Sequence, residues 1–376
     1  MTLHLRSITL REIQMSLVEP FQISSGTASL RRILILETRD ADGVTAWSEC
    51  VAGEQPNFSP ETIDTAWLAI RKWIGPRVLG VPLARPEAIL PLLDAELRGH
   101  LMAKAAVEMG VWGLAAQRQE ISLAGLLGGT RPQIATGISI GIQDNPAQLV
   151  DKVRRSFEQG YQKAKIKVKP GADLAYLHAV HEEVGAGAPL MADANSAYTT
   201  ADFDHLSEFD RFDLMMIEQP LAWDDLVRHA ALQRRLSTPL CLDESITSVD
   251  RVDDMLTLES GRIVNIKSGR VGGLAAAVSI HDRCAAAGVP VWCGGMLESG
   301  IGRAYNVALA SLPNFVLPGD VSPSARYWQQ DIVTPEWTMD DGGWVTVPRD
   351  RPGIGVTVDR DRVENLTVRS ETLTAG

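Results

Sequence analysis

The chain has 376 residues, 45% of them apolar and 22% charged, with a net charge of −11 at pH 7. This is the composition of an ordinary globular protein, and its acidic balance argues against a nucleic-acid partner. No apolar run approaches the roughly 18 residues of a membrane span, so we expect no membrane association. The four cysteines are scattered without metal-type spacing, which favours reduced, buried thiols in a cytoplasmic protein.

Residues 1–125 are predicted to form an α+β unit. Apolar or alternating runs predict an antiparallel meander with strands at 3–17, 28–39 and 44–51. Helical patterns follow at about 60–74, 85–97 and 99–118. The last helix is apolar nearly all round and is predicted to be buried between two units. Two polar stretches, 19–29 and 52–58, are predicted to be loops that reach over a site on a neighbouring unit.

Residues 126–322 are predicted to form a barrel of alternating strands and helices. The predicted strands are 134–142, 163–169, 190–195, 215–220, 239–245, 262–269, 289–295 and 315–320. Their regular spacing indicates a repeated βα unit. The chain after the eighth strand is too polar and too short for another barrel helix, so we expect a (β/α)7β modified TIM barrel. Residues 323–376 are expected to return to the N-terminal unit and complete an α+β capping domain.

Five charged residues stand at the ends of consecutive predicted strands: Lys167, Asp193, Glu218, Asp243 and Lys267. The C-terminal ends of barrel strands meet on one rim, so these side chains should converge. A carboxylate facing the helices instead would be buried and unpaired, at a cost of several kcal/mol. Three converging acids repel one another unless a cation neutralises them. Ligand oxygens without His or Cys favour Mg²⁺, with Mn²⁺ as the alternative, over zinc.

A second interpretation of the acids is that each caps the helix that follows it. Helix capping explains one acid easily, but it does not explain three acids that recur at the same place in successive strand–helix units, between two lysines. Lys167 and Lys267 are candidate bases, and Lys165 shares the strand face of Lys167. A lysine that acts as the catalytic base must be neutral part of the time, so we expect desolvation and nearby positive charge to lower its pKa. The alternative for the lysine-rich strand is a solvated edge strand, but the apolar residues between its lysines favour burial.

Several motifs extend this pattern along most of the chain. They are Lys-Ile-Lys at 165–167, DANSAY at 193–198, IEQPL at 217–221, LDES at 242–245, NIKSGRVGG at 265–273, and VWCGGMLESGIGRA with LPGD between 291 and 320. In these motifs the chain resembles the enolase superfamily, in its muconate-lactonizing subgroup. It is most similar to the branch of N-succinylamino acid racemases and o-succinylbenzoate synthases.

The resemblance implies roles for the rim residues. Asp193, Glu218 and Asp243 would bind Mg²⁺, while Lys167 and Lys267 would act as acid and base on opposite faces of the substrate, with Lys165 as a helper. Arg270 matches a position that this branch associates with racemisation, and Phe58 stands where relatives often carry Tyr. The expected substrate contacts are Asn195, Arg270, Glu298, Phe21, Ser24, Phe58 and Met296. The resemblance also implies a homo-oligomer.

The implied reaction starts with removal of the proton next to the carboxylate of a small substrate, giving an enediolate. Return of a proton to the opposite face would racemise an N-acylamino acid, with an N-succinyl group expected. The same residues would serve an o-succinylbenzoate synthase, in which a β-hydroxyl departs. A muconate-type cycloisomerase is a further alternative. A Schiff-base aldolase, from a different class, also places a lysine on the sixth barrel strand but does not need three acids.

Overall fold

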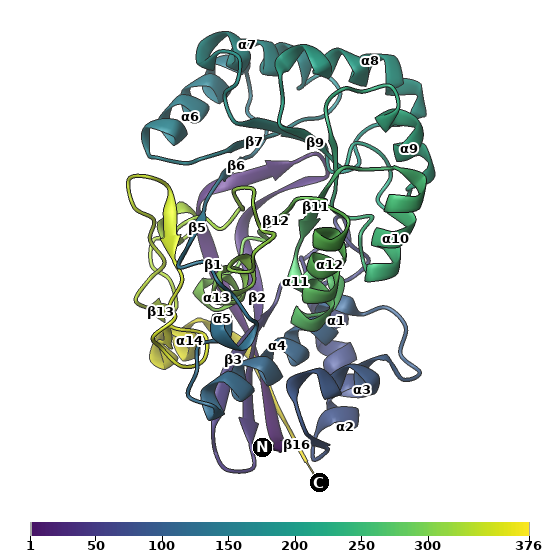
Figure 1. Ribbon diagram of the computed structural model, residues 1–376. Coiled ribbons are helices and arrows are strands. Elements are labelled where there is room, and N and C mark those ends of the chain that lie inside the picture. Colours follow the sequence, from purple (N-terminus) through teal and green to yellow (C-terminus); the bar gives the residue numbers. More distant parts are fainter. Residues whose placement is uncertain (1, 376) are drawn as a thin grey trace.

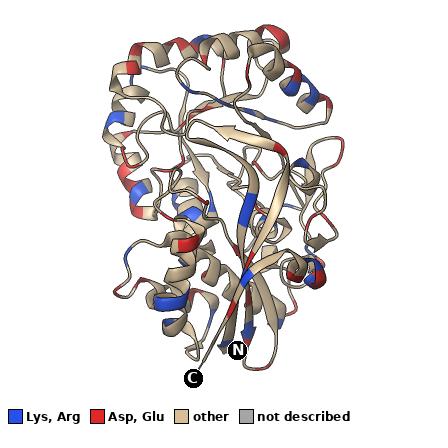
Figure 2. Cartoon of the chain, turned by 180° about the vertical axis from the view of Figure 1, so that it is seen from behind, with Lys and Arg blue, Asp and Glu red and all other residues tan. Residues whose placement is uncertain are grey.

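The computed structural model describes residues 2–375 and has two parts (Figure 1). An antiparallel sheet with short helices forms the foot of the molecule, where both termini lie. A curved parallel sheet forms the other part, and its helices lie along the outside. Figure 2 shows acidic and basic residues interspersed on these outer helices. None of the helices in the described residues is both long and apolar enough to cross a membrane.

The sheet of the capping domain confirms the predicted meander and extends it. Its strands are β1 (Leu3–Ile23), β2 (Gly26–Asp40), β3 (Thr45–Cys50), β4 (Pro82–Leu83) and β16 (Thr367–Thr374). The strand order is β16-β1-β2-β3, and β4 pairs with β1. The loop predicted at 19–29 is instead the end of the β1–β2 hairpin, because pairing resumes at Phe21 and Ala28 after a register shift. Paired backbone therefore brings this hairpin to the barrel.

The helices of the capping domain include one long, buried helix. They are α1 (Ile63–Ala69), α2 (Gly75–Val78), α3 (Leu90–Asp94), α4 (Leu101–Arg118) and α5 (Leu123–Leu126). Helix α4 is buried along most of its length and packs against β2 and β3 on one side and barrel helices on the other. This confirms the prediction that its apolar surface lies between two units.

The barrel sheet contains β6 (Ile138–Ile140), β7 (Ala164–Lys167), β8 (Leu190–Asp193), β9 (Met216–Glu218), β10 (Leu240–Leu242), β11 (Ile263–Ile266) and β12 (Val291–Cys293). These strands are parallel and lie in chain order. The strand predicted at 134–142 is divided into β5 (Gln133–Ala135) and β6. The segment predicted as an eighth strand makes only isolated bridges, Phe315 to Val291 and Gly319 to Thr136. Pro318 has no N–H to donate, which explains why this closing segment forms no regular ladder.

The helices outside the sheet are α6 (Pro146–Glu158), α7 (Leu174–Val184), α8 (Phe203–Ser207), α9 (Val227–Gln233), α10 (Val249–Leu258), α11 (Ser268–Val271), α12 (Leu274–Ala286) and α13 (Gly300–Ala310). The C-terminal segment adds β13 (Val333–Thr334), β14 (Trp344–Thr346), β15 (Thr357–Val358) and α14 (Arg360–Leu366). Strand β14 pairs with β5 near the barrel, whereas β16 pairs with β1. The return of the chain to the capping domain thus comes through β16.

Glu108 of α4 connects the capping domain to a barrel helix. Its two carboxylate oxygens accept hydrogen bonds from the first N–H groups of α12, those of Leu274 and Ala275, both at 2.9 Å. Trp112 donates a third hydrogen bond at 2.7 Å. Gly273 precedes the helix at φ 131°, and a Cβ there would lie 2.5 Å from the Glu108 carboxyl. A carboxylate at a helix N-terminus replaces the missing intrahelical acceptors.

We expect Glu108→Ala to lower the free energy of unfolding by about 2–5 kcal/mol, because two buried N–H groups lose their acceptor. Chemical denaturation followed by circular dichroism measures this loss. Glu183→Ala, at an exposed position of α7, is the matched control and should change the free energy little. A loss for Glu108→Ala no larger than that of the control would contradict the role of Glu108.

Candidate active site

The predicted rim residues lie on five adjacent strands. In the sheet order, β8 ends at Asp193, β9 ends at Glu218 and Asp243 directly follows β10. These three strands lie between β7, which ends at Lys167, and β11, which Lys267 follows directly. Lys167 is paired in register with Asp193, and Asp193 with Glu218. The order around the rim is therefore lysine, three acids, lysine. The five residues therefore lie at neighbouring positions along one end of the sheet, and their roles in metal binding and catalysis stay predictions.

Lys165 and Lys167 both contact the acids of this rim. Lys167 Nζ lies 2.5 Å from Asp193 Oδ2. Lys165 Nζ lies 3.2 Å from both Asp193 Oδ2 and Glu218 Oε2, and 2.6 Å from Asp320 Oδ2. All five side chains are buried. Lys165 thus bridges two of the predicted metal ligands to an acid on the segment that closes the barrel.

The second lysine pairs with the third acid. Lys267 Nζ lies 2.5 Å from Asp243 Oδ2, and Arg270 Nε lies 3.0 Å from Asp243 Oδ1. The Arg270 guanidinium also donates to the carbonyls of Ile246 and Asn265. Arg270 does not line the cavity described below, so the structure assigns it to Asp243 rather than to direct substrate contact.

Burial and charge act in opposite directions on these acids. Burial favours the neutral form of Asp193, but Lys167 and Lys165 outweigh it and hold the pKa of Asp193 below its usual range. Burial, followed by the neighbouring charge of Asp193, raises the pKa of Glu218 to about 7. Glu244 is raised to a pKa of about 8 by burial and by Asp243. Of the three rim acids, Glu218 is therefore the one whose negative charge is least neutralised by neighbouring cations.

The expectation that burial and nearby positive charge lower the pKa of a rim lysine stays a prediction for the cation-bound site. Burial lowers the pKa of Lys267, but Asp243 and Glu218 outweigh burial and raise it. The same balance raises the pKa of Lys165, with Asp320 and Glu218 as the main opposing charges. The prediction weighed desolvation and positive charge, whereas the acids facing these lysines decide the direction.

The acid side chains have spare acceptor capacity for a cation. Glu218 Oε2 and Asp243 Oδ1 are buried and accept no hydrogen bond, although cationic nitrogens lie 3.2 and 3.0 Å away. Across residues 2–375, however, no set of three acidic, His or Cys side chains is gathered as a ready-made metal cage. The carboxylates pair with lysine and arginine nitrogens instead. The donor set fits a hard divalent cation, provided that these side chains turn toward it.

Asn195 links the rim to the capping hairpin. It has a left-handed φ of 42°, its Oδ1 accepts from Lys167 Nζ at 2.6 Å, and its Nδ2 donates to Glu244 at 3.1 Å. Ser24, at the tip of the β1–β2 hairpin, donates to the Asn195 carbonyl at 3.2 Å. Asn195 lines the cavity described below, whereas Ser24 does not line that cavity and binds the Asn195 backbone instead.

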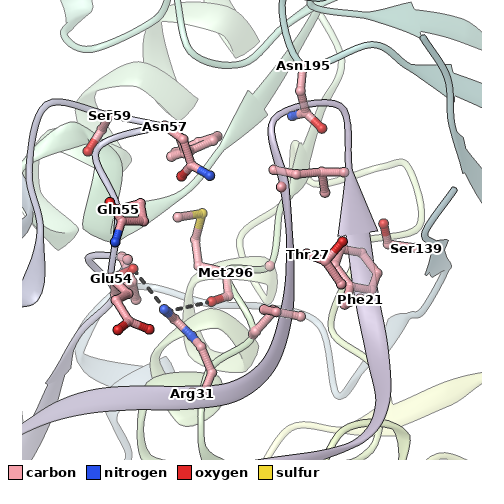
Figure 3. A pocket seen from close by; sticks show the side chains of 18 of the residues that line it. Phe21, Thr27, Arg31, Glu54, Gln55, Asn57, Ser59, Ser139, Asn195 and Met296 are labelled. Atoms are coloured by element: carbon pink, nitrogen blue, oxygen red, sulfur yellow. Dashed lines mark hydrogen bonds between the residues drawn. The ribbon is translucent and has the colours of Figure 1, made fainter.

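A cavity of about 340 Å³ opens between the hairpin, the 52–58 loop and the barrel mouth (Figure 3). Phe21, Phe58 and Met296 line it together with Lys165, Lys167 and Lys267. The Lys267 ammonium lies 4.6 Å from the centre of the Phe58 ring, a cation–π contact. The predicted contacts at Phe21, Phe58 and Met296 therefore share one cavity with the lysines. Glu298 does not line it, and its carboxylate instead accepts from Asn306 at 2.8 Å.

Two charged residues of the capping sheet hold the loop that carries Met296. Arg31 donates to the Met296 carbonyl at 3.2 Å and also to the carbonyls of Val51 and Ala52 (Figure 3). Glu49 accepts from the N–H of Ser299 and from its hydroxyl, which lies 2.6 Å away. These contacts fix the β12–α13 loop to the capping domain.

Sequence reasoning missed Asp320 and Asn265 as parts of the site. Asp320 lines the cavity and pairs with Lys165, and Asn265 Nδ2 donates to Glu218 Oε1 at 2.6 Å. The position of each residue in the sequence could have indicated its role. Asp320 ends the last predicted strand, and Asn265 shares the strand face of Lys267.

Comparisons with known proteins agree with this geometry. Residues 148–362 match the family model "Enolase C-terminal domain-like", and residues 6–128 match "Mandelate racemase / muconate lactonizing enzyme, N-terminal domain". The o-succinylbenzoate synthase of Geobacillus stearothermophilus is 48% identical over 98% of this chain and 97% of its own length. The N-succinylamino acid racemase of an Amycolatopsis species is 44% identical over 96% and 97%. A crystal structure of an enolase superfamily member from Listeria innocua has a TM-score of 0.94 and 39% identity, covering 99% of both chains.

The buried Glu49 predicts a pH-dependent stability. Burial raises its pKa to about 8, while the hydrogen bond from Ser299 opposes the shift. The folded protein therefore keeps this proton up to about pH 8, whereas the unfolded chain releases it near pH 4.5. Because the folded state binds more protons between these values, stability falls as the pH rises through this window.

We expect Glu49→Gln to flatten this fall by on the order of 3 kcal/mol, since glutamine does not titrate. Urea denaturation of both proteins at pH values from 5 to 9 measures the difference. Parallel curves for the two proteins would show that Glu49 does not titrate within the window.

Proposed function

The chain belongs to the enolase superfamily, and we propose that it racemises N-succinylamino acids by removing and returning the proton α to their carboxylate. The observation that carries this proposal is the order of the rim, in which three acids lie between two lysines. Transfer of a proton from one face of a carbon to the other requires a base on each face. Lys167 and Lys267 both line the cavity and supply these two bases.

Asp193, Glu218 and Asp243 would hold the divalent cation, Mg²⁺ or Mn²⁺. When bound, this cation supplies positive charge that orients the substrate carboxylate and stabilises the developing enediolate. Members of the superfamily generally use Mg²⁺. The spare buried oxygens of Glu218 and Asp243 support this role.

The side chains of the rim then divide the work. One of the two lysines accepts the α-proton, and the other donates a proton to the opposite face. Lys165, whose pKa is raised by its acidic neighbours, stays protonated and adds positive charge near the substrate carboxylate. Asn195 fixes Lys167 through a 2.6 Å hydrogen bond. Residues of the hairpin and of the 52–58 loop line the cavity on the side of the capping domain.

A second candidate, o-succinylbenzoate synthase, is favoured by the 48% identical Geobacillus relative of that name. In that reaction a lysine removes the proton α to the carboxylate, and a hydroxyl on the β-carbon leaves as water. The departing hydroxyl takes up a proton from a protonated lysine. The same rim serves both reactions, so a single chain can support both activities.

The first test is α-proton exchange on N-succinyl-L-phenylalanine in D₂O with Mg²⁺, read by mass and by chiral chromatography. We expect deuterium uptake together with the D-enantiomer, and loss of both in EDTA. Uptake without inversion would contradict racemisation and direct the assay to o-succinylbenzoate formation. No uptake with this or other N-acylamino acids would contradict the proposal.

Replacing each lysine tests the two-base mechanism. We expect Lys167→Ala and Lys267→Ala each to reduce racemisation by about 10²- to 10⁴-fold, the usual contribution of a positioned acid or base. Each variant should lose exchange from one enantiomer more strongly than from the other. Lys169→Ala, at a partly exposed position two residues beyond β7, is the matched control and should keep its activity. Full racemisation by Lys267→Ala would exclude the two-base mechanism.

A further inference from the structure

Lys163 is a buried lysine behind the proposed active site. Its side chain is fully buried, directly before β7, and within residues 2–375 its ammonium makes no hydrogen bond. The nearest acid is Asp320, whose Oδ1 lies 3.6 Å from Lys163 Nζ. The Trp292 ring lies below the ammonium, with its centre also 3.6 Å away.

This arrangement is costly for a residue that only fills space. Burial lowers the pKa of Lys163, and Asp320 is the main charge that opposes this shift. A methionine would fill a similar volume with no ammonium to desolvate. The backbone makes room for the lysine at Gly137, where a Cβ would lie 2.8 Å from Lys163 Cε. A charged group in such a fitted position points to an electrostatic task.

The task follows from the two oxygens of Asp320. Oδ1 faces Lys163 at 3.6 Å, and Oδ2 binds Lys165 at 2.6 Å. Lys165 in turn lies 3.2 Å from both Asp193 and Glu218. Asp320 therefore competes with the predicted metal ligands for Lys165. The attraction between Asp320 and Lys165 depends on how far the negative charge of Asp320 is neutralised at its other oxygen, Oδ1. Lys163 is the cation next to that oxygen.

We propose that Lys163 is a positioning residue that acts through Asp320 to hold the Lys165 ammonium at the active site. This inference rests on the proposed function, because it assigns Lys165 to the substrate carboxylate. Lys163 does not line the cavity, so it is assigned no direct contact with the substrate. Its charge balances Asp320, so that Lys165 is shared between Asp320 and the rim acids instead of being drawn away from them. The Trp292 ring stabilises the Lys163 ammonium by a cation–π contact.

The experiment compares Lys163→Met, Lys163→Arg, Asp320→Asn and the double variant Lys163→Met/Asp320→Asn with the wild type. The assay is Mg²⁺-dependent α-proton exchange on N-succinyl-L-phenylalanine, with kcat and KM separated and the thermal midpoint measured in parallel. Since Lys163 acts on orientation, we expect Lys163→Met to lower kcat by about 10- to 100-fold with KM nearly unchanged. Lys163→Arg keeps the charge and should recover most of kcat.

The double variant tests the route through Asp320. Because both residues act on Lys165 as one unit, its loss in kcat should be smaller than the product of the two single losses. A crystal structure of Lys163→Met should show the Lys165 ammonium still bound to Asp320 but farther from Asp193 and Glu218 than the 3.2 Å of the wild type. Should Lys163→Met fail to fold, Lys163→Arg and Asp320→Asn decide the matter, as an Asp320→Asn kcat equal to the wild type would overturn the proposal.

Other outcomes also overturn the inference. These are a wild-type kcat in folded Lys163→Met, losses in the double variant that simply multiply, and an Arg variant no better than Met. Each is measured relative to an active wild type. Failure of the wild type itself to exchange the proton would refute the proposed function instead, so the two failures are distinguishable.

Discussion

The structure depends on the balance of buried charge at the mouth of the barrel. Within the described residues, the acids of the rim are buried next to lysine or arginine nitrogens at 2.5–3.2 Å. A buried carboxylate without such a partner would take up a proton or destabilise the fold. The compensation is incomplete at Glu218, whose pKa is raised to about 7. A divalent cation would supply the positive charge that Glu218 lacks and favour its ionised form.

The capping domain lines the cavity and also holds the helices and loops of the site in place. Glu108 and Glu49 reach from the capping domain to the N-termini of α12 and α13, the helices that follow the Lys267 and Met296 segments. Ser24 reaches Asn195 from the hairpin. Because the carboxyl oxygens of both glutamates accept hydrogen bonds from N–H groups at the starts of these helices, the contacts fix the domain interface and the loops of the site together. Movement of the capping domain therefore changes the cavity wall.

The strand-end residues of the site were predictable because the βα repeat is regular, so equal spacing along the chain becomes adjacency around the rim. The acids, both rim lysines and the buried α4 followed from periodicity and from the cost of burying charge. Three features did not follow. The β1–β2 hairpin replaces a predicted loop, since cross-strand pairing outweighed the polar composition of 19–29. The eighth strand is reduced to isolated bridges. The raised pKa of Lys267 depends on distances to Asp243 and Glu218 that spacing does not contain.

The rim and the cavity wall are under different constraints. On the rim, exchanging one charged residue leaves a buried partner unpaired, which costs roughly 3–5 kcal/mol. In the wall, Phe21 and Met296 have no such coupling, and their side chains can change size without unpairing a charge, whereas the Phe58 ring contacts the Lys267 ammonium. Racemisation and dehydration both begin with removal of the same kind of proton, which requires the rim but not one particular wall. The choice between these reactions is therefore expected to lie in the capping loops, where the substrate's acyl group and side chain are held.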